Sequence, residues 1–340
     1  MSKKILVISK DAGSSIQNNL LIPELKNLNF EIDCFSQSPG ASFYSNQCAN
    51  EVPEDQNYYE FFDHYFRNNN VSGVLVGFSS REDGIDEIAC QVAKNLGIPT
   101  FAVQDYWGNQ GKFKSNQIPD YIFLGNEIAY DLSVDFYEGI SELVITGLPK
   151  YDGYRTIAKE KYIKQTHDGL NIGIFLQPLS IDAYLRSSEG ILDSLSSLSS
   201  INRLFCKFHP ATTKEESSSI QKKYPYFDIE KEPDNLVLFN KTDILVTVDS
   251  TCAIDFFEYA KFLNRPKLII SCQFSDHISD FLEDYSVNAM NSIAKIATSK
   301  YELVSAIEEF SNRPTIDEKI DILNAKSSIT SISEFIDLTV

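Results

Sequence analysis

Short apolar runs recur along the whole chain, and each precedes a loop and a segment with apolar residues at helical spacing. The run at residues 4–9 (KILVIS) is continuous, which is typical of a strand buried on both faces of a parallel sheet. A helical stripe follows it, formed by Ile16, Leu20, Leu21, Leu25 and Leu28. Residues 30–35 then have the pattern of a second strand. The chain therefore opens with a β-α-β unit, and its repetition predicts an α/β protein with parallel sheets.

The same patterns predict the remaining elements. Strands are expected at 71–78, 98–103, 119–124, 141–145, 170–176, 203–206, 243–248 and 267–271. Helices are expected at 58–66, 85–96, 127–135, 191–201, 253–262, 285–297, 300–310 and 316–338, with 224–228 and 236–239 as short strands or linkers.

A charged helical segment at residues 153–169 separates two series of strands and helices. At 340 residues the chain is long enough for two domains. We expect two Rossmann-like domains, at residues 1–155 and 156–315. A C-terminal helix in 316–340 should pack near their junction.

Charge and cysteine usage narrow the class of protein. Lys and Arg total 30 against 48 Asp and Glu, a net charge of −18 without a basic cluster, which argues against nucleic-acid binding. The 6 cysteines are widely spaced, with neither CxxC pairs nor metal-site spacing. The N-terminus leads straight into a strand, and no apolar run reaches the length of a membrane span. We expect a cytoplasmic protein. The sequence does not decide whether it contacts a membrane surface peripherally.

One strand-to-helix junction carries the segment Lys207-Phe208-His209-Pro210. Lys207 supplies a point charge, and His209 can donate a hydrogen bond or a proton to a phosphate oxygen. Pro210 restricts the loop that leads to the next helix. This combination favours a pyrophosphate site over a histidine that merely packs its loop.

A second junction carries Asp249-Ser250-Thr251, between the predicted strand at 243–248 and the helix at 253–262. Ser and Thr are common N-caps, but here two hydroxyls and free N–H groups follow a buried strand, which suits a phosphate. Asp255 and Glu258 are three residues apart on that helix, and either carboxylate could accept hydrogen bonds from a ribose diol.

These segments resemble a known group of enzymes. KFHP at 207–210 looks like the His-Pro motif of bacterial sialyl-, polysialyl- and Kdo-transferases and of CDP-glycerol glycerophosphotransferases. The DST segment at 249–251, with Arg265-Pro266 after its helix, is similar to their nucleotide-phosphate element. It also resembles that of non-hydrolysing UDP-N-acetylglucosamine 2-epimerases, although Ser250-Thr251-Cys252 replaces their Ser-Gly-Gly. TGLPKYD at 146–152 looks like the TGxPxxD exit of the N-terminal domain in these proteins.

The resemblance implies a GT-B glycosyltransferase, with two Rossmann-like domains facing across a cleft. The first domain would hold the acceptor, and the second would hold the nucleotide-activated donor. His209, Ser250 and Thr251 would bind the nucleotide phosphates, together with Lys207 and Pro210, and Asp255 or Glu258 would face the ribose. Enzymes of this sort need neither a bound metal nor a further cofactor.

The proposed chemistry also needs a base near the acceptor hydroxyl. We expect Asp11, in the loop after the first strand, to be this base, with Glu82 and Asp83 behind it. Glu82-Asp83-Gly84 is a loose echo of the Asp/Glu-Asp/Glu-Gly motif of sialyltransferases. Trp107 follows another predicted strand, and the sequence favours neither packing nor contact with the acceptor as the role of its side chain.

We therefore expect transfer of a sugar or polyol phosphate to a surface-polysaccharide or glycolipid acceptor. The competing hypotheses are a sugar-nucleotide 2-epimerase and a nucleotide-sugar-binding protein without catalysis. The sequence does not select among CMP, UDP, GDP and CDP.

Overall fold

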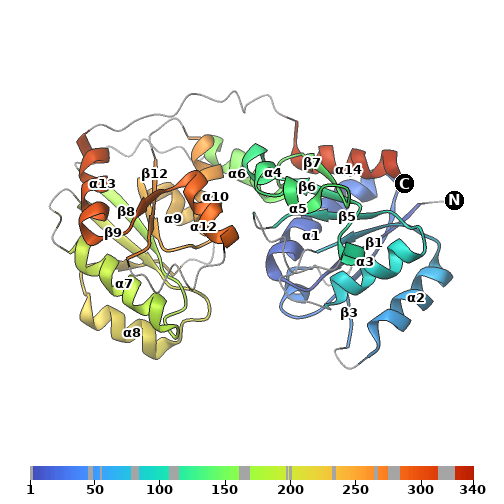
Figure 1. The fold of residues 1–340 in the computed structure, drawn as a ribbon, viewed down its shortest axis with the longest axis horizontal. Coiled ribbons are helices and arrows are strands. Elements are labelled where there is room, and N and C mark those ends of the chain that lie inside the picture. The colour runs from blue at the N-terminus through green and yellow to red at the C-terminus, as the bar shows by residue number, and fades with distance from the viewer. Residues whose placement is uncertain are drawn as a thin grey trace. The chain divides into compact units, whose positions relative to one another are not determined.

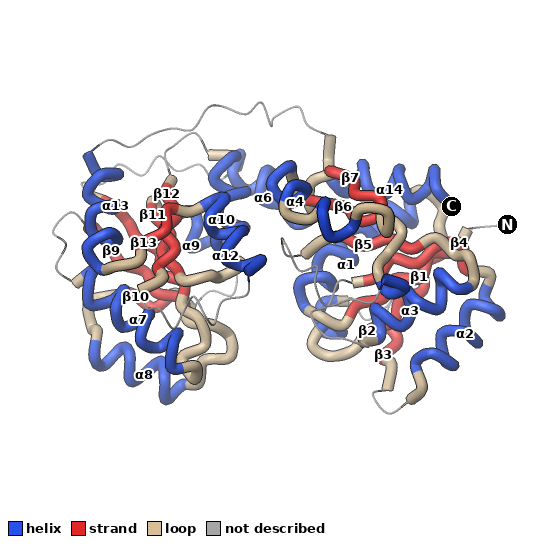
Figure 2. Tube along the Cα trace, viewed as in Figure 1, coloured by secondary structure: helices blue, strands red, loops and turns tan. Residues whose placement is uncertain are grey.

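The structure is a computed structural model. It describes residues 3–44, 49–53, 56–77, 84–105, 107, 115–160, 169–196, 198, 201–231, 235–263, 267–274, 284–312 and 326–340. The chain forms two compact units (Figure 1): unit 1 comprises Met1–Gly153 with Asn324–Val340, and unit 2 comprises Tyr154–Leu323. Each unit is built on its own parallel sheet, and helices cover the strands (Figure 2).

Unit 1 contains a 7-stranded sheet in the order β3-β2-β1-β4-β5-β6-β7. Its strands are β1 Lys4–Ser9, β2 Glu31–Ser36, β3 Ala49–Glu51, β4 Val71–Val76, β5 Thr100–Val103, β6 Tyr121–Leu124 and β7 Glu142–Ile145. The apolar run that opens the chain is the middle of this sheet, and Ile5 to Ile8 are fully buried, as expected for a strand covered on both faces. The order of the strands reverses between β1 and β4.

The helices of unit 1 lie on both faces of the sheet. They are α1 Ala12–Asn27, α2 Tyr58–Asn69, α3 Ile85–Asn95, α4 Glu127–Asp131, α5 Val134–Tyr137 and α14 Ser328–Thr339, with the short helices η1 Gly40–Phe43 and η2 Ser115–Gln117. Helix α1 packs with α14, and α2 packs with α3. Right-handed crossovers from the central strands toward opposite edges place α1 and α3 on opposite faces. The C-terminal helix belongs to this unit: the Phe335 ring lies 5.2 Å from Tyr121 and 5.5 Å from Phe123.

Helix α6, Pro149–Glu160, contains the boundary between the units, and unit 2 follows with a 6-stranded sheet in the order β10-β9-β8-β11-β12-β13. Its strands are β8 Leu170–Phe175, β9 Ile201–Lys207, β10 Asp228–Ile229, β11 Ile244–Thr247, β12 Leu268–Cys272 and β13 Lys295–Ala297. Its helices are α7 Asp182–Leu195, α8 Lys214–Lys223, α9 Asn235–Lys241, α10 Cys252–Lys261, α12 Asp284–Ile293 and α13 Lys300–Asn312.

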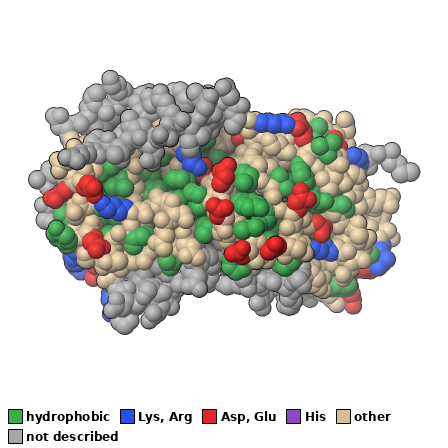
Figure 3. Space-filling model, turned by 45° about the horizontal axis from the view of Figure 1, so that its top comes forward, with side chains coloured by type: hydrophobic (Ala, Val, Ile, Leu, Met, Phe, Trp, Pro, Cys, Tyr) green, Lys and Arg blue, Asp and Glu red, His purple; other side chains and the backbone are tan. Residues whose placement is uncertain are grey.

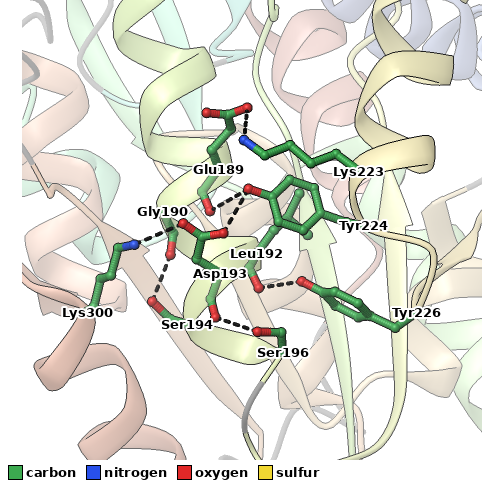
Figure 4. A network of polar contacts seen from close by, with 10 residues as sticks. All are labelled: Glu189, Gly190, Leu192, Asp193, Ser194, Ser196, Lys223, Tyr224, Tyr226 and Lys300. Atoms are coloured by element: carbon green, nitrogen blue, oxygen red, sulfur yellow. Dashed lines mark hydrogen bonds and ion pairs between the residues drawn. The ribbon is translucent and has the colours of Figure 1, made fainter.

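A polar network connects three segments of unit 2 (Figure 4). The Asp193 carboxylate of α7 accepts a hydrogen bond from the Tyr224 hydroxyl at 2.9 Å and pairs with Lys300 Nζ of α13 at 3.0 Å. These two contacts lower the pKa of Asp193. Lys223 of α8 pairs with Glu189 of α7 at 2.7 Å. The network therefore fixes α8 and α13 against α7, so the residues that form it have a structural role.

Four predicted elements differ from the structure. The helix expected at 191–201 is wrong: α7 ends at Leu195, and β9 begins at Ile201. Helix α7 starts earlier, at Asp182, and buries Ser187, Ser188 and Gly190. A built Cβ at Gly190 would lie 2.8 Å from the Phe274 ring, so small residues form the packed face that an apolar pattern does not reveal.

The other differences concern short elements. Residues 236–239 belong to α9, because a run of four apolar residues fits a buried helix turn as well as a strand. The helix expected at 285–297 ends at Ile293, and Lys295–Ala297 form the edge strand β13. The helix expected at 127–135 is two short helices, α4 and α5.

Candidate functional site

The candidate nucleotide site lies at the carboxyl edge of the unit 2 sheet. Strands β9, β8 and β11 are parallel neighbours, so the loops that follow them leave the sheet at the same edge. The strand order reverses between β8 and β11, and ligands of open α/β sheets bind at such a reversal.

Asp249, at the end of β11, connects the elements around this reversal. One carboxylate oxygen accepts a hydrogen bond from the Gln177 amide, which follows β8, and the other accepts one from the Tyr184 hydroxyl of α7 at 2.9 Å. Asp249 therefore holds the loop that presents the next two residues.

Ser250 and Thr251 occupy the N-terminal end of α10. Ser250 Oγ accepts a hydrogen bond from the Cys252 N–H at 3.3 Å, and the Ser250 carbonyl accepts one from Ala253 at 2.9 Å. Thr251 is exposed, and among the described residues its side chain makes no capping bond. Two hydroxyls thus lie at the positive end of a 10-residue helix, which favours an anion.

The β9 exit presents Lys207 and His209. Side chains alternate across an extended segment, and Phe208 between them packs into the core, with its ring 6.4 Å from Phe227. Lys207 and His209 are both partly exposed. The alternation therefore directs a cation and an imidazole away from the core.

A turn over residues 209–212 fixes the imidazole. The Thr212 N–H donates to the His209 carbonyl at 2.8 Å, and Pro210 occupies the second position, where its fixed φ suits a turn. The Ala211 N–H donates to His209 Nδ1 at 3.1 Å, so the neutral ring carries its proton on Nε2. Burial lowers the pKa of His209, which makes the neutral form dominant at pH 7. Its Nε2–H is then a hydrogen-bond donor at the carboxyl edge of the sheet.

The neighbouring helix α8 has a different N-terminus. Thr213 Oγ1 accepts from the Glu216 N–H at 3.2 Å, and Glu216 Oε2 accepts from the Thr213 N–H at 2.7 Å. This capping box satisfies the helix end internally. At the start of α10 the N–H groups of Ser250, Cys252, Ala253 and Ile254 also donate within their own segment, so the feature of this helix end that suits an anion is its pair of hydroxyls.

The structure separates the two carboxylates considered for a ribose. Asp255 lies in the first turn of α10, beside Thr251, and is partly exposed. Glu258 lies one turn further along the helix, is buried, and pairs with Lys261 Nζ at 2.7 Å. Asp255 is thus at the same helix end as the two hydroxyls, and Glu258 is engaged elsewhere.

In unit 1, Asp11 lies at the β1 exit, as the N-cap residue of α1, and is partly exposed. Glu82 and Asp83 lie outside the described residues. The structure brings a different pair of carboxyl groups to this edge: Asp86 and Glu87 are both buried in the first turn of α3. The Lys10 N–H donates to Asp86 Oδ2 at 3.2 Å. Burial and the negative charge of Glu87 raise the pKa of Asp86 well above its ordinary value.

Sequence reasoning also missed Asp105, which follows β5 at the same edge of the sheet. The first turn of α1 is so close that a Cβ built at Gly13 would lie 1.8 Å from Asp105 Oδ2. Lys150 Nζ lies 4.0 Å from Asp105 Oδ1. The signal in the sequence that could have drawn attention to Asp105 was a carboxylate just after a buried strand. Trp107 is buried, which favours packing over acceptor contact for this residue.

The described residues are informative about metal binding and membrane insertion. They contain no group of three or more His, Cys, Asp or Glu side chains that could hold a metal ion, and metal independence stays a prediction. None of the described helices is long and apolar enough to cross a membrane. Figure 3 shows Asp and Glu side chains scattered among hydrophobic ones on one face of the molecule, where Lys and Arg side chains are scattered too.

No protein-family model and no curated protein matches the chain, but solved structures match its fold. One is UDP-GlcNAc 2-epimerase from Methanocaldococcus jannaschii, with a TM-score of 0.66 and 15% identity over 98% of this chain and 99% of that one. A second is UDP-GlcNAc 2-epimerase from Neisseria meningitidis bound to UDP-GlcNAc, with a TM-score of 0.64 and 12% identity over 99% of both chains. A third is MurG from Acinetobacter baumannii, also with a TM-score of 0.64 and 12% identity over 99% of both chains.

Identities this low establish the fold alone. The fold expected from the motifs is confirmed: the chain is an α/β protein with two Rossmann-like domains, built like the UDP-GlcNAc 2-epimerases and the GT-B glycosyltransferases.

Proposed function

We propose that the protein is a GT-B-type glycosyltransferase that moves a sugar or polyol phosphate from a nucleotide-activated donor to a glycan or glycolipid acceptor. One observation carries the proposal: the His209 Nε2–H and the hydroxyls of Ser250 and Thr251 lie at the carboxyl edge of one parallel sheet, on either side of β8. Such an arrangement is suited to a diphosphate.

Each residue has a distinct task in this proposal. The N-terminal end of α10, with Ser250 and Thr251, binds phosphate oxygens, and Lys207 supplies positive charge near them. His209 donates its Nε2–H to the phosphate oxygen that becomes negative when the sugar–phosphate bond breaks. Pro210 holds the turn that orients this ring. We assign the ribose diol to Asp255, because Glu258 is buried and paired with Lys261.

The structural neighbours suggest which donors to test first. The Neisseria enzyme was solved with UDP-GlcNAc, and an MnaA from S. aureus with 15% identity and a TM-score of 0.61 was solved with UDP. UDP-sugars are therefore the first candidates for this chain. We also propose that the reaction takes place in the cytoplasm and needs no metal ion. Its product would contribute to the synthesis of a surface polysaccharide.

An epimerase is the second candidate, because UDP-GlcNAc 2-epimerases of nearly the same chain length match the whole fold. Against it, Ser250-Thr251-Cys252 replaces the Ser-Gly-Gly of those enzymes. Incubation with UDP-GlcNAc alone separates the two functions, since the epimer forms without an acceptor only in an epimerase. A binding protein without catalysis would bind a nucleotide tightly and turn over no donor.

The test begins with a thermal-shift panel of CMP, UDP, GDP and CDP, followed by nucleotide release from the matching sugar donors. We expect His209→Ala to lower kcat by about 10²–10³-fold, which is typical of losing one donor to a developing negative charge. His209→Gln, which can place an amide N–H near the former Nε2, should retain more activity.

His64 provides the matched control, because it is exposed on α2 of unit 1. His64→Ala should leave kcat unchanged. The proposal fails if no nucleotide stabilises the protein, or if His209→Ala retains the full rate with every donor that the wild type uses.

A further inference from the structure

Strand β7, Glu142–Ile145, forms one edge of the unit 1 sheet, and among the described strands it pairs with β6 alone. The N–H groups of Glu142 and Thr146 donate to carbonyl oxygens on the β6 side, at 2.8 and 3.0 Å. Because backbone groups alternate along a strand, Leu143 and Ile145 direct their N–H and C=O groups away from β6. The strand therefore presents hydrogen-bonding groups to which a further strand could pair.

Apolar side chains are exposed along this edge. Ile145 is 44% exposed, Ile140 just before the strand is 38% exposed, and Phe136 of α5 is 55% exposed. Helices α4 and α5 contact β7 (Figure 1), so these side chains come from neighbouring segments. The register with β6 places Leu143 and Ile145 on the sheet face opposite α14, because Phe335 of that helix packs on the other face. An exposed apolar edge strand is suited to strand addition by another chain.

The charge around this edge has a single sign. No Lys or Arg occurs at residues 115–149, the segment that contains α4, α5 and β7. Exposed carboxylates without an ion pair to any described residue occur there, at Glu127, Asp131, Asp135, Glu138 and Glu142. A cationic partner would complement them. Two copies of this edge paired about a twofold axis would instead bring the same carboxylates together, which is unfavourable.

We propose that the β7 edge is a docking site for an extended segment of another protein in which basic and apolar residues alternate. The segment adds a strand to the sheet and pairs with the outward backbone groups of β7. Glu142 lies on the sheet face opposite Leu143 and Ile145. The added strand would therefore place its basic side chains on the Glu142 face and its apolar ones beside Ile145. The site is separate from the proposed nucleotide site, which lies in unit 2.

The probe is a fluorescent peptide of about eight residues in which Lys and Val alternate, a length that fits one strand. A peptide of the same composition with its lysines and valines in separate blocks tests for the alternation. A peptide that alternates Glu and Val tests for the charge. Fluorescence anisotropy measures Kd at low and high salt. We expect the alternating Lys-Val peptide to bind at least about 10-fold more tightly than either of the others, and more weakly at high salt.

Variants of the edge test where the peptide binds. Ile145→Pro removes an outward N–H and leaves the hydrogen bonds to β6 in place, a substitution that edge strands tolerate. It should raise Kd by about 10-fold or more, as should Ile145→Lys, which places a like charge against the peptide. Glu142→Lys should raise Kd by about 2–10-fold. The matched controls are Leu338→Lys, at a side chain of α14 that is 88% exposed, and Glu308→Lys on α13, and each should change Kd by less than about 2-fold.

Failure of the alternating Lys-Val peptide to bind at low salt would overturn the proposal. A folded Ile145→Pro variant that retains the wild-type Kd would also overturn it, and circular dichroism establishes that the variant folds. If Ile145→Pro does not fold, Ile145→Lys decides in the same way. Sedimentation equilibrium provides a further test: a wild-type dimer that these variants convert to a monomer would assign the edge to a second copy of the chain instead.

Discussion

At the residue scale, burial determines the ionisation of Asp86. Its carboxyl group is completely buried, Glu87 follows it, and Asp11 adds further negative charge. Together these raise the pKa of Asp86 in the folded protein above the unfolded value of about 4. The folded state therefore loses stability as the pH rises from about 4 through the folded pKa.

Asp86→Asn removes this penalty while keeping an oxygen to accept the Lys10 N–H. We expect the variant to raise the Tm of unit 1 by about 2–4 °C at pH 8, equivalent to ~1 kcal/mol, and by less at pH 4. Thermal unfolding of the variant and wild type across this pH range provides the measurement. A stabilisation that is equal at both pH values would contradict the electrostatic explanation.

Residue-scale chemistry explains what the sequence could predict about the site. The segments at 207–210 and 249–251 were recognisable because their Lys, His and hydroxyl residues directly follow buried strands. The position of Asp105 beside Gly13 and Lys150 could not be predicted in this way, because these residues are distant in sequence. No local pattern encodes such a juxtaposition.

At the element scale, the TGLPKYD segment joins α6 to the C-terminal helix. Gly147 has a φ of +80°, and a Cβ there would lie 2.3 Å from Ser328 Oγ. The Asp152 carboxylate accepts hydrogen bonds from Ser327 Oγ at 2.8 Å, the Ser328 N–H at 3.1 Å and the Ile329 N–H at 3.0 Å. It thus caps α14, which makes the role of this part of the motif structural.

Asp152→Ala leaves those three donors without their carboxylate. We expect a loss of about 1.5–3 kcal/mol, because hydrogen bonds to a charged group at a helix N-terminus are strong. Amide hydrogen exchange should accelerate in residues 328–339 before it changes in the strands of unit 1. Asp152→Asn, which keeps one acceptor oxygen, should show a smaller effect, and unchanged exchange in Asp152→Ala would contradict the capping role.

Elements differ in how far their sequence determines them. The long apolar strands and the amphipathic helix α3 were predicted well, because burial imposes a period on many residues. Helix α7 was misplaced because its packed face contains serine and glycine, and β13 is a three-residue edge strand with too little pattern to detect. Close packing and edge pairing are tertiary properties, so they leave weak signals in the sequence.

At the scale of the whole molecule, two sheets with separate cores predict two unfolding events. The proposed nucleotide site lies entirely in unit 2, so a nucleotide should stabilise that unit selectively. At 100 times Kd the stabilisation is about 2.7 kcal/mol, which corresponds to about 5–10 °C in Tm for a domain of this size. Differential scanning calorimetry with and without UDP measures this shift.

Variants identify which transition belongs to which unit. Asp86→Asn moves the transition of unit 1, whereas Ser250→Ala combined with Thr251→Val should abolish the UDP-dependent shift of the other transition and leave the protein folded. A single transition that moves as a whole would contradict independent unfolding of the two units. A UDP-dependent shift in the transition that Asp86→Asn also moves would show that the nucleotide binds in unit 1, against the proposal. Separate movement of the two transitions is expected because the ligand stabilises only the fold to which it binds.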